Sequence, residues 1–271
     1  MLSLGQDMSR VRPPAVAGVF YPFDASELRR AVTAFMDDCP GRQPTRVPKA
    51  IIVPHAGYRY SGPVAGCAYR LLRDAGARFS HVVLLGPSHR VPMRGLAVPS
   101  VDAFATPLGD VPVDSAGRQR LRELGLAGIS DAPHAAEHSI EVQLPFLQAV
   151  LGDFDLLPIA VGLAPPDQVA RALDAVWNGP DTLVVVSSDL SHYHTSEDAR
   201  QLDAQATRSI LEQRSDLADE LACGARGING LMQVTRRRGL VVQLLDQRNS
   251  GDTAGDRSRV VGYGSYAAFE P

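Results

Sequence analysis

Three segments of the sequence place polar, chemically active side chains directly after a short apolar run. The side chains are His55, His89, Asp189 and His192. If each apolar run is a buried strand of a parallel sheet, the turns that follow share one edge of that sheet, which is where open α/β sheets bind ligands. We therefore expect these side chains to converge on one polar site.

Histidines dominate this predicted site. Of the 7 histidines in the chain, His138 and His194 also lie in neighbouring turns, while His81 and His134 stand apart. Neutral imidazoles are good ligands for iron, copper, zinc and nickel, and a mononuclear site needs only two or three of them together with an anion. A bound metal ion is therefore the most economical interpretation of the cluster.

A metal-free hydrolase is an alternative interpretation of the same residues. His192 would act as general base, oriented by Asp189, and the nucleophile would be Ser61, Ser88 or Ser191. The sequence lacks the GxSxG elbow that is typical of α/β hydrolases. We therefore prefer the metal hypothesis and retain the metal-free hydrolase as a less favoured hypothesis.

A helix predicted over residues 140–151 carries an apolar stripe that should pack on the sheet. His138 and Glu141 are three residues apart at its start, so they share a different side of its first turn. Both are candidates for contact with a substrate.

The 3 cysteines are odd in number and far apart in the sequence, so a disulfide scaffold is not expected. Cys39 lies in a connector and Cys67 in an apolar helical stretch, which predicts that both are inert. Cys223 precedes a predicted helix, where backbone N–H groups and Arg226 could stabilise a thiolate. Position alone leaves open whether Cys223 takes part in the site.

Short apolar runs alternate with segments of helical character along most of the chain. The predicted strands cover residues 50–53, 81–85, 156–161, 183–186, 240–245 and 260–269. The predicted helices cover residues 64–73, 115–123, 140–151, 166–176, 197–213 and 228–238. This alternation is typical of an α/β fold. We predict a single domain over residues 1–271, with a mostly parallel central sheet flanked by helices.

Composition argues against several classes of protein. The net charge is -3, and the one basic run, residues 236–238, has no aromatic stacking residues beside it, so no nucleic-acid partner is expected. Lys49 is the single lysine, and no GxxxxGK[ST] phosphate loop is present. The apolar runs are far shorter than a membrane span, and residues 1–12 lack the layout of a secretory signal. We expect a cytoplasmic protein without membrane contact.

Several short motifs, in order along the chain, give the sequence a nearly full-length resemblance to the Memo family, also called AmmeMemoRadiSam system protein B. The motifs are RPPAVAGVFYP at 12–22, PHAGY at 54–58 followed by SG at 61–62, LGPSH at 85–89, EHSIEVQLPF at 137–146, SDLSHY at 188–193, CG at 223–224, NSGD at 249–252 and VGY at 261–263. Their number and order make the resemblance specific.

The resemblance implies a fold similar to that of the LigB-type class III extradiol dioxygenases, which hold non-haem iron(II) with two histidines and a carboxylate. In the Memo family a cysteine replaces the carboxylate, so the resemblance implies His55, His89 and Cys223 as metal ligands. It also implies that Asp189 and His192 line the same pocket as catalytic groups. The implied cofactor is iron(II) or copper, with zinc as a third choice, because a thiolate shifts metal preference toward softer ions.

These observations predict a metal-binding redox protein or oxygenase-like enzyme that acts on an unknown small molecule or peptide. The alternative is a non-catalytic module that uses the same pocket to bind a metal, a peptide or another protein. Asp189 and His192 favour chemistry, because a pure binder does not require proton-transfer groups. The resemblance also implies a functional link to radical SAM and AMMECR1-like proteins.

Overall fold

The computed structural model describes residues 10–41 and 46–271 of the chain. Residues 1–9, on which the expected lack of a secretory signal mainly rests, lie outside the described residues, as does the middle of the predicted connector, residues 42–45. Within the described ranges, no helix combines the length and the apolar character that crossing a membrane would require.

The centre of the molecule is a mixed sheet, which has nine strands in the described part of the chain. Their order is β10-β12-β2-β9-β3-β8-β4-β7, and β11 pairs with β12. The strands are β2 (Ala50–Val53), β3 (His81–Pro87), β4 (Leu96–Val98), β7 (Gly128–Ile129), β8 (Asp155–Val161), β9 (Thr182–Ser187), β10 (His192–His194), β11 (Val241–Asn249) and β12 (Val260–Phe269). The four central strands β2, β9, β3 and β8 are parallel, whereas β4, β10, β11 and β12 join in antiparallel pairs.

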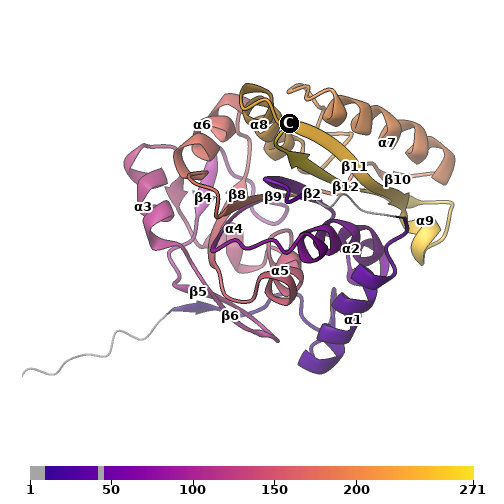
Figure 1. Cartoon of the computed structure of the whole chain (residues 1–271), viewed down its shortest axis with the longest axis horizontal. Coiled ribbons are helices and arrows are strands. Elements are labelled where there is room, and N and C mark those ends of the chain that lie inside the picture. Colours follow the sequence, from indigo (N-terminus) through magenta and orange to yellow (C-terminus); the bar gives the residue numbers. More distant parts are fainter. Residues whose placement is uncertain (1–9, 42–45) are drawn as a thin grey trace, which may run out of the picture.

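Helices cover both faces of this sheet, which confirms the predicted α/β class. The helices α3 (Ser115–Glu123), α6 (Pro166–Val176), α7 (Ser196–Leu211) and α8 (Ala225–Arg237) cover one face, and α1 (Ala25–Asp37), α2 (Tyr58–Asp74) and α5 (Leu144–Leu151) the other. Figure 1 shows α6, α7 and α8 above the sheet and α1, α2 and α5 below it.

Alternate residues of the central strands supply the two hydrophobic cores. In β3, Val83 and Leu85 belong to the core beneath α6 and α8, whereas Val82 and Leu84 belong to the core beneath α1 and α2. Because both faces of these strands are buried, the strands are unbroken apolar runs rather than alternating ones. The carboxyl ends of β2, β3 and β9 consequently meet at one edge, as predicted.

The predicted elements are found, with one helix divided. Helices α3 and α6 and strand β12 coincide with the predicted ranges. The helix predicted over residues 140–151 is a 3-10 turn (Glu141–Gln143) followed by α5. Pro145 explains the division, because it has no N–H to donate to the carbonyl of Glu141 in a continuous α-helix.

Several elements were not predicted from the sequence. They are α1, the short helices α4 (Ala132–Ala135) and α9 (Ser250–Thr253), the strands β4, β7 and β10, and a small second sheet of β1 (Val11–Arg12), β5 (Ala103–Thr106) and β6 (Gly109–Pro112). In this second sheet β1 pairs with β5, about ninety positions further along the chain. Short strands of this kind depend on distant partners and carry a weak local signal.

Cys39 and Cys67 form a disulfide, so the expectation that both cysteines are inert and that no disulfide forms is wrong. The two residues are 28 positions apart and both are buried. Helix α1 approaches α2 closely at Gly66, where a Cβ would collide with the backbone of Phe35. This packing of α1 on α2 brings the two sulfur atoms together, which the spacing of cysteines along the sequence does not show.

Candidate metal centre

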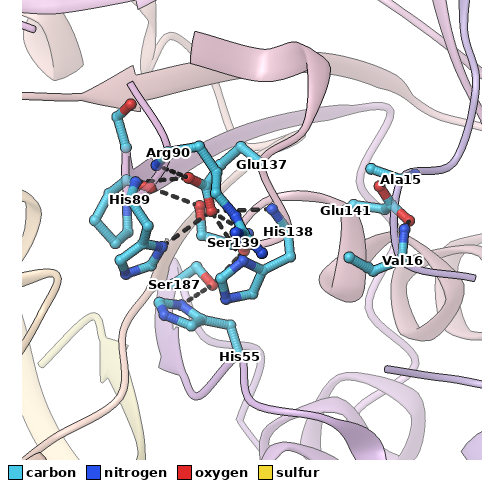
Figure 2. A network of polar contacts seen from close by, with 12 residues as sticks. Ala15, Val16, His55, His89, Arg90, Glu137, His138, Ser139, Glu141 and Ser187 are labelled. Atoms are coloured by element: carbon cyan, nitrogen blue, oxygen red, sulfur yellow. Dashed lines mark hydrogen bonds and ion pairs between the residues drawn. The ribbon is translucent and has the colours of Figure 1, made fainter. Parts of the chain in front are cut away.

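Three histidines meet at the carboxyl edge of the sheet. His55 follows β2, His89 follows β3, and His138 lies in the loop before the 3-10 turn. One ring nitrogen from each lies within 4.8 Å of one from each of the others. The rings of His89 and His138 are stacked with centroids 5.0 Å apart, and Figure 2 shows all three rings gathered in one place. The group can hold a metal ion.

A buried network fixes the tautomer of His55. Its Nδ1 lies 2.9 Å from the Oγ of Ser187. That hydroxyl donates its one proton to the carbonyl of Ser139, at 2.6 Å, and accepts a hydrogen bond from Gln143 Nε2, at 2.8 Å. It must therefore accept from His55 Nδ1–H, which leaves the lone pair on Nε2 to a metal ion.

The ring of His55 is also neutral. His55 is 2% exposed, and burial, followed by the proximity of His89 and His138, lowers its pKa well below the ordinary value. A metal ion binds the neutral form of imidazole, so no proton has to be displaced from this ligand at neutral pH.

One carboxylate, that of Glu137, supports the other two histidines. Its Oε1 lies 3.0 Å from Nδ1 of His89 and 3.2 Å from Nδ1 of His138 (Figure 2). Its two oxygens also accept backbone N–H bonds from His89, His138 and Ser139. Because Glu137 holds the Nδ1 side of both rings, their Nε2 atoms are left for a shared ligand, which is the usual arrangement of metal-binding histidines.

Glu137 is ionised even though it is buried. Burial alone would raise its pKa, but the side chains of His138 and His89 and the backbone N–H of Ser139 hold that pKa well below its usual range. The two rings are not held equally. His89 Nδ1 forms a hydrogen bond to the carboxylate, whereas His138 Nδ1 is buried and has no well-aligned hydrogen-bond partner in the described residues. His138 is therefore the least firmly oriented of the three ligands.

Glu141 lies away from this group, in contrast to the prediction that it contacts a substrate. It is fully buried, and its Oε2 pairs with Nη1 of Arg12 at 2.6 Å. Its oxygens also accept hydrogen bonds from the backbone of Ala15 and Val16 and from the hydroxyl of Tyr21. Figure 2 shows Glu141 facing Ala15 and Val16, away from the histidines. Glu141 therefore anchors the N-terminal segment.

Arg12 connects this anchor to the loop of His138. Its guanidinium donates to the carbonyl oxygens of His134, at 2.7 Å, and Glu137, at 2.6 Å. In the same N-terminal segment, Phe20 packs its ring against that of His138, with centroids 4.7 Å apart. The buried ion pair between Arg12 and Glu141 thus helps to position His138.

Asp189 and His192 approach the histidine group from the loop after β9. The Oδ1 of Asp189 accepts the backbone N–H of His55 at 2.7 Å. Burial raises the pKa of Asp189, although the His55 N–H and the nearby His192 oppose the rise. His192 begins β10 and lies close enough to His55 and Asp189 to lower the pKa of each. The structure thus brings Asp189 into direct contact with the histidine group and His192 to its vicinity.

The loop of Asp189 and His192 is held from behind by α7 and β12. Asp203 of α7 accepts the backbone N–H of Ser191 at 3.0 Å, and Gly262 exchanges backbone hydrogen bonds with Leu190 and Ser191. A Cβ on Gly262 would collide with the Asp203 carboxyl, so this close approach requires glycine. Burial raises the pKa of Asp203 to about 6.

Cys223 lies beside His55 but outside the group of three histidines. Its Sγ is 3.2 Å from Nε2 of His55. The backbone around it is fixed, because Cys223 N–H donates to Asp189 and Gly224 N–H donates to Ser188 Oγ. The sulfur can therefore move by rotation of its side chain, without movement of the chain.

The helix start does not make Cys223 a thiolate, in contrast to the effect considered from the sequence. Burial, followed by the charge of Asp189, raises the pKa of the thiol. Arg226, which was considered as the stabilising cation, pairs with Asp219 instead. The sulfur is a thiol that donates a hydrogen bond toward His55, and becoming a metal ligand would require loss of its proton.

The metal-free hydrolase receives no support from the serines. The hydroxyls of Ser61 and Ser88 each donate to a nearby backbone carbonyl, and the hydroxyl of Ser191 has no hydrogen-bond partner among the residues described. In that part of the chain, none of the three is hydrogen-bonded to His192. The nucleophile and base of a serine hydrolase are therefore not assembled.

The groups that orient the histidines were not found from the sequence. Glu137 and Gln143 lie within the EHSIEVQLPF motif, where only His138 and Glu141 were singled out. The sequence offers one signal for Glu137, which is that this carboxylate directly precedes His138. Ser187 gives no comparable signal, because its role depends on partners from two other segments, one with His55 and one with Ser139 and Gln143.

The arrangement of donors fits a transition-metal ion. Two of the three rings have their Nδ1 nitrogen hydrogen-bonded, to Ser187 or Glu137, which leaves Nε2 for an ion. The Nδ1 of His138 is buried without a well-aligned hydrogen bond and lies 3.2 Å from the ionised carboxylate of Glu137. This is expected if the His138 ring forms that hydrogen bond fully only when a cation binds. Three imidazole nitrogens suit iron, copper, zinc or nickel and do not select among them.

Comparison with known proteins gives a full-length match in sequence. Residues 12–267 match the family described as Memo-like protein. A MEMO1 family protein of Aquifex aeolicus is 39% identical over 274 residues, which span 94% of this chain and 97% of the relative. A MEMO1 family protein of Desulfurococcus amylolyticus is 37% identical over 275 residues, which span 93% and 96% of the two chains.

A solved structure shows the same fold at much lower identity. The uncharacterized protein JW3007 of Escherichia coli K12 superposes with a TM-score of 0.51 and 15% identity, covering 80% of this chain and 99% of that chain. This similarity extends to the α/β architecture alone.

Proposed function

The chain belongs to the Memo family, and we propose that it is a metal-binding redox protein whose ion is held by His55, His89 and His138. The observation that carries this proposal is the group of three ring nitrogens within 4.8 Å of one another. The oriented Nδ1 atoms behind them support it, because they present Nε2 to a common point.

The proposed ion is iron(II) or copper, with zinc as a redox-inactive alternative. Imidazole donors suit all three, and a thiol sulfur 3.2 Å from Nε2 of His55 favours the softer ions among them. When bound, iron or copper would supply Lewis acidity and one-electron chemistry at this point. The set of His55, His89 and Cys223 that the family resemblance implies stays a prediction beside the three-histidine set.

Asp189 and His192 are the proposed proton-handling groups. Asp189 is buried against His55, and its raised pKa brings the proton of the carboxyl closer to neutral pH, which suits an acid–base role. Imidazole is the side chain best matched to proton transfer at neutral pH, and His192 supplies it beside Asp189. Together they would move protons to and from an unknown small molecule or peptide at the ion.

The second candidate function is a non-catalytic module that binds a metal and a peptide or protein. Tyr193, next to His192, favours it, because this residue is 64% exposed and its ring lies under the guanidinium of Arg259. Exposed aromatic side chains are enriched at binding surfaces. The implied link to radical SAM and AMMECR1-like proteins is a further prediction, which co-purification would test.

The proposal is tested by elemental analysis after anaerobic purification. Wild type is compared with His55→Ala, His89→Ala and His138→Ala, and with His81→Ala as a control at a half-exposed histidine at the start of β3. We expect about one iron or copper ion per chain in wild type and in the control, and loss in the three ligand variants. Wild type that is purified without metal and takes up none on titration would contradict the proposal.

The choice between the two candidate functions needs a second measurement. Oxygen consumption by the metal-loaded protein is compared between wild type and Asp189→Asn, with catechols as the first substrates. Turnover that falls in the variant while metal content is unchanged would support the redox enzyme. Metal that stays bound without any turnover would favour the binding module.

A further inference from the structure

A small cavity lies beside the histidine group, on the face of the sheet that α8 covers. Its walls are Leu85 of β3, Val161 of β8 and Val186 of β9, each at or near the carboxyl end of its strand. Gly227, in the first turn of α8, closes it on the helix side. The cavity offers about 20 Å³ to the centre of a water-sized sphere, which is room for about one small molecule.

The inner part of this cavity is apolar. Leu85, Val161 and Val186 are buried hydrophobic residues. Ser187 also borders the cavity, but strand alternation points its hydroxyl to the opposite face of the sheet, where all its hydrogen bonds are made. The guanidinium of Arg226, at the rim, is held in an ion pair. An apolar cavity of this kind tends to stay dry, because water in it gives up hydrogen bonds.

One end of the cavity adjoins the proposed metal centre. Pro87 and Cys223, both half-buried, line that end. Pro87 ends β3, two positions before His89, and the side chain of Cys223 is in contact with Nε2 of His55. A molecule in the cavity is therefore separated by a single side chain from the nitrogens that are proposed to hold the ion.

We infer that this cavity binds dioxygen, as the oxidant that the proposed redox centre consumes. Dioxygen is small, uncharged and apolar, so it matches the volume and the walls of the cavity. A larger organic substrate does not fit in this volume, which leaves the cavity to the smaller reactant. The inference rests on the proposed function and adds its second substrate and the place where that substrate is held.

Gly227 keeps this space free. A Cβ at this position would lie 3.2 Å from Cγ1 of Val186 and 3.9 Å from Cβ of Leu85, between two walls of the cavity. The backbone of Gly227 does not need glycine, because its φ angle is not in the left-handed region. A glycine inside a helix costs about 1 kcal/mol relative to alanine. The space beside Gly227, rather than its backbone conformation, therefore explains the residue.

The experiment uses dissolved dioxygen itself as the probe of the metal-free full chain. Dioxygen is paramagnetic, so it accelerates the nuclear relaxation of the methyl groups that it contacts. Methyl NMR compares the three apolar wall residues with Leu28 and Val32 of α1, which are fully buried. Gly227→Val fills the cavity, and Val161→Leu, a milder change, narrows it from the opposite wall. Circular dichroism verifies folding of both variants.

In wild type we expect the relaxation enhancement at the wall methyl groups to exceed that at Leu28 and Val32 at least about fivefold. It should fall to the level of those two residues in Gly227→Val and lie between in Val161→Leu. Cobalt(II), a spectroscopic substitute for the proposed ion, should bind both variants within about twofold of the wild-type affinity, because neither residue belongs to the histidine group or its hydrogen-bond network.

Two results would overturn the inference alone. One is equal enhancement at all buried methyl groups of wild type, and the other is an enhancement that persists in the folded variants. Wild type that gathers dioxygen in the cavity but binds no cobalt(II) would instead overturn the proposed function, and with it the role of this dioxygen as an oxidant.

Discussion

The two loops that meet at the histidine group are held by buried carboxyl groups in opposite ways. Glu137 contacts two histidine side chains and several backbone N–H groups, and its pKa lies well below the usual range. Asp203, behind the loop of His192, accepts the backbone N–H of Ser191, and burial raises its pKa to about 6. Both residues are about equally buried. The number of donors, rather than burial, therefore decides in which direction the pKa of each carboxyl moves.

This difference predicts that the loop of Glu137 depends on charge and the loop of Asp203 on close packing. The first loop has a second charged anchor, the ion pair of Glu141 with Arg12. The second loop is fixed by backbone hydrogen bonds to Gly262. Substitutions that remove charge should therefore harm the first loop and spare or improve the second.

The largest effect is expected for Glu141→Ala. The substitution leaves the buried guanidinium of Arg12 without its partner and removes the acceptor for three further donors. We expect a loss of about 3–5 kcal/mol in the free energy of unfolding, measured by urea denaturation. Glu123→Ala, at an exposed carboxylate of α3, is the control. A loss below about 1 kcal/mol would show that the charged anchor does not hold this loop.

The next effect is expected for Glu137→Gln. An amide retains the size of the side chain but offers one acceptor oxygen in place of a carboxylate, so several N–H donors lose their partner. We expect about 1–3 kcal/mol of destabilisation and a 10- to 100-fold weaker affinity for cobalt(II). Unchanged affinity in a folded variant would mean that Glu137 does not orient the histidines.

A smaller effect of opposite sign is expected for Asp203→Asn. The pKa of Asp203 is raised from 3.8 to about 6, so the folded state retains a proton that the unfolded state releases. Stability from this group is therefore present below pH 4, is lost between pH 4 and 6, and stays lost above. A shift of this size corresponds to a loss of at most about 3 kcal/mol in the free energy of unfolding at pH 7. Burying the amide of asparagine also costs free energy, so we expect Asp203→Asn to raise the free energy of unfolding by about 1–2 kcal/mol at pH 7.

The pH dependence separates this effect from a general change in packing. The difference in unfolding free energy between Asp203→Asn and wild type should grow from pH 4 to pH 6 and then level off. The imidazole of His194 acts on this carboxyl through its charge, so His194→Ala provides the control. A difference that is constant with pH would contradict a raised pKa for Asp203.

The elements that can be predicted from the sequence are those whose signal is local. Strand β3 and helix α6 follow from apolar runs and periodicity, and the carboxyl edge of a parallel sheet places His55 and His89 together. Helix α1 was missed although Asp24 caps it and its buried residues recur every fourth position. That signal was present in the sequence but was not used.

Other features depend on contacts between distant segments, which no local pattern specifies. The disulfide forms because Gly66 lets α1 approach α2. Glu141 follows His138 by three residues, yet it has a structural role, because its carboxylate pairs with the buried Arg12, which is 129 positions away. Tertiary partners of this kind decide whether a polar residue serves the site or the fold.

The smallest effect on stability is expected for His89→Ala. This substitution removes one of the histidine partners of Glu137 rather than Glu137 itself. The side chain of His89 is 30% exposed and lies in a turn, so its removal leaves little cavity. Glu137 retains its backbone donors, including the N–H of residue 89 itself, and should remain charged. We therefore expect less than about 1 kcal/mol of destabilisation together with loss of the metal, measured by urea denaturation and elemental analysis. An unfolded variant would show instead that the loop depends on the imidazole, and that His89 has a structural role rather than that of a ligand.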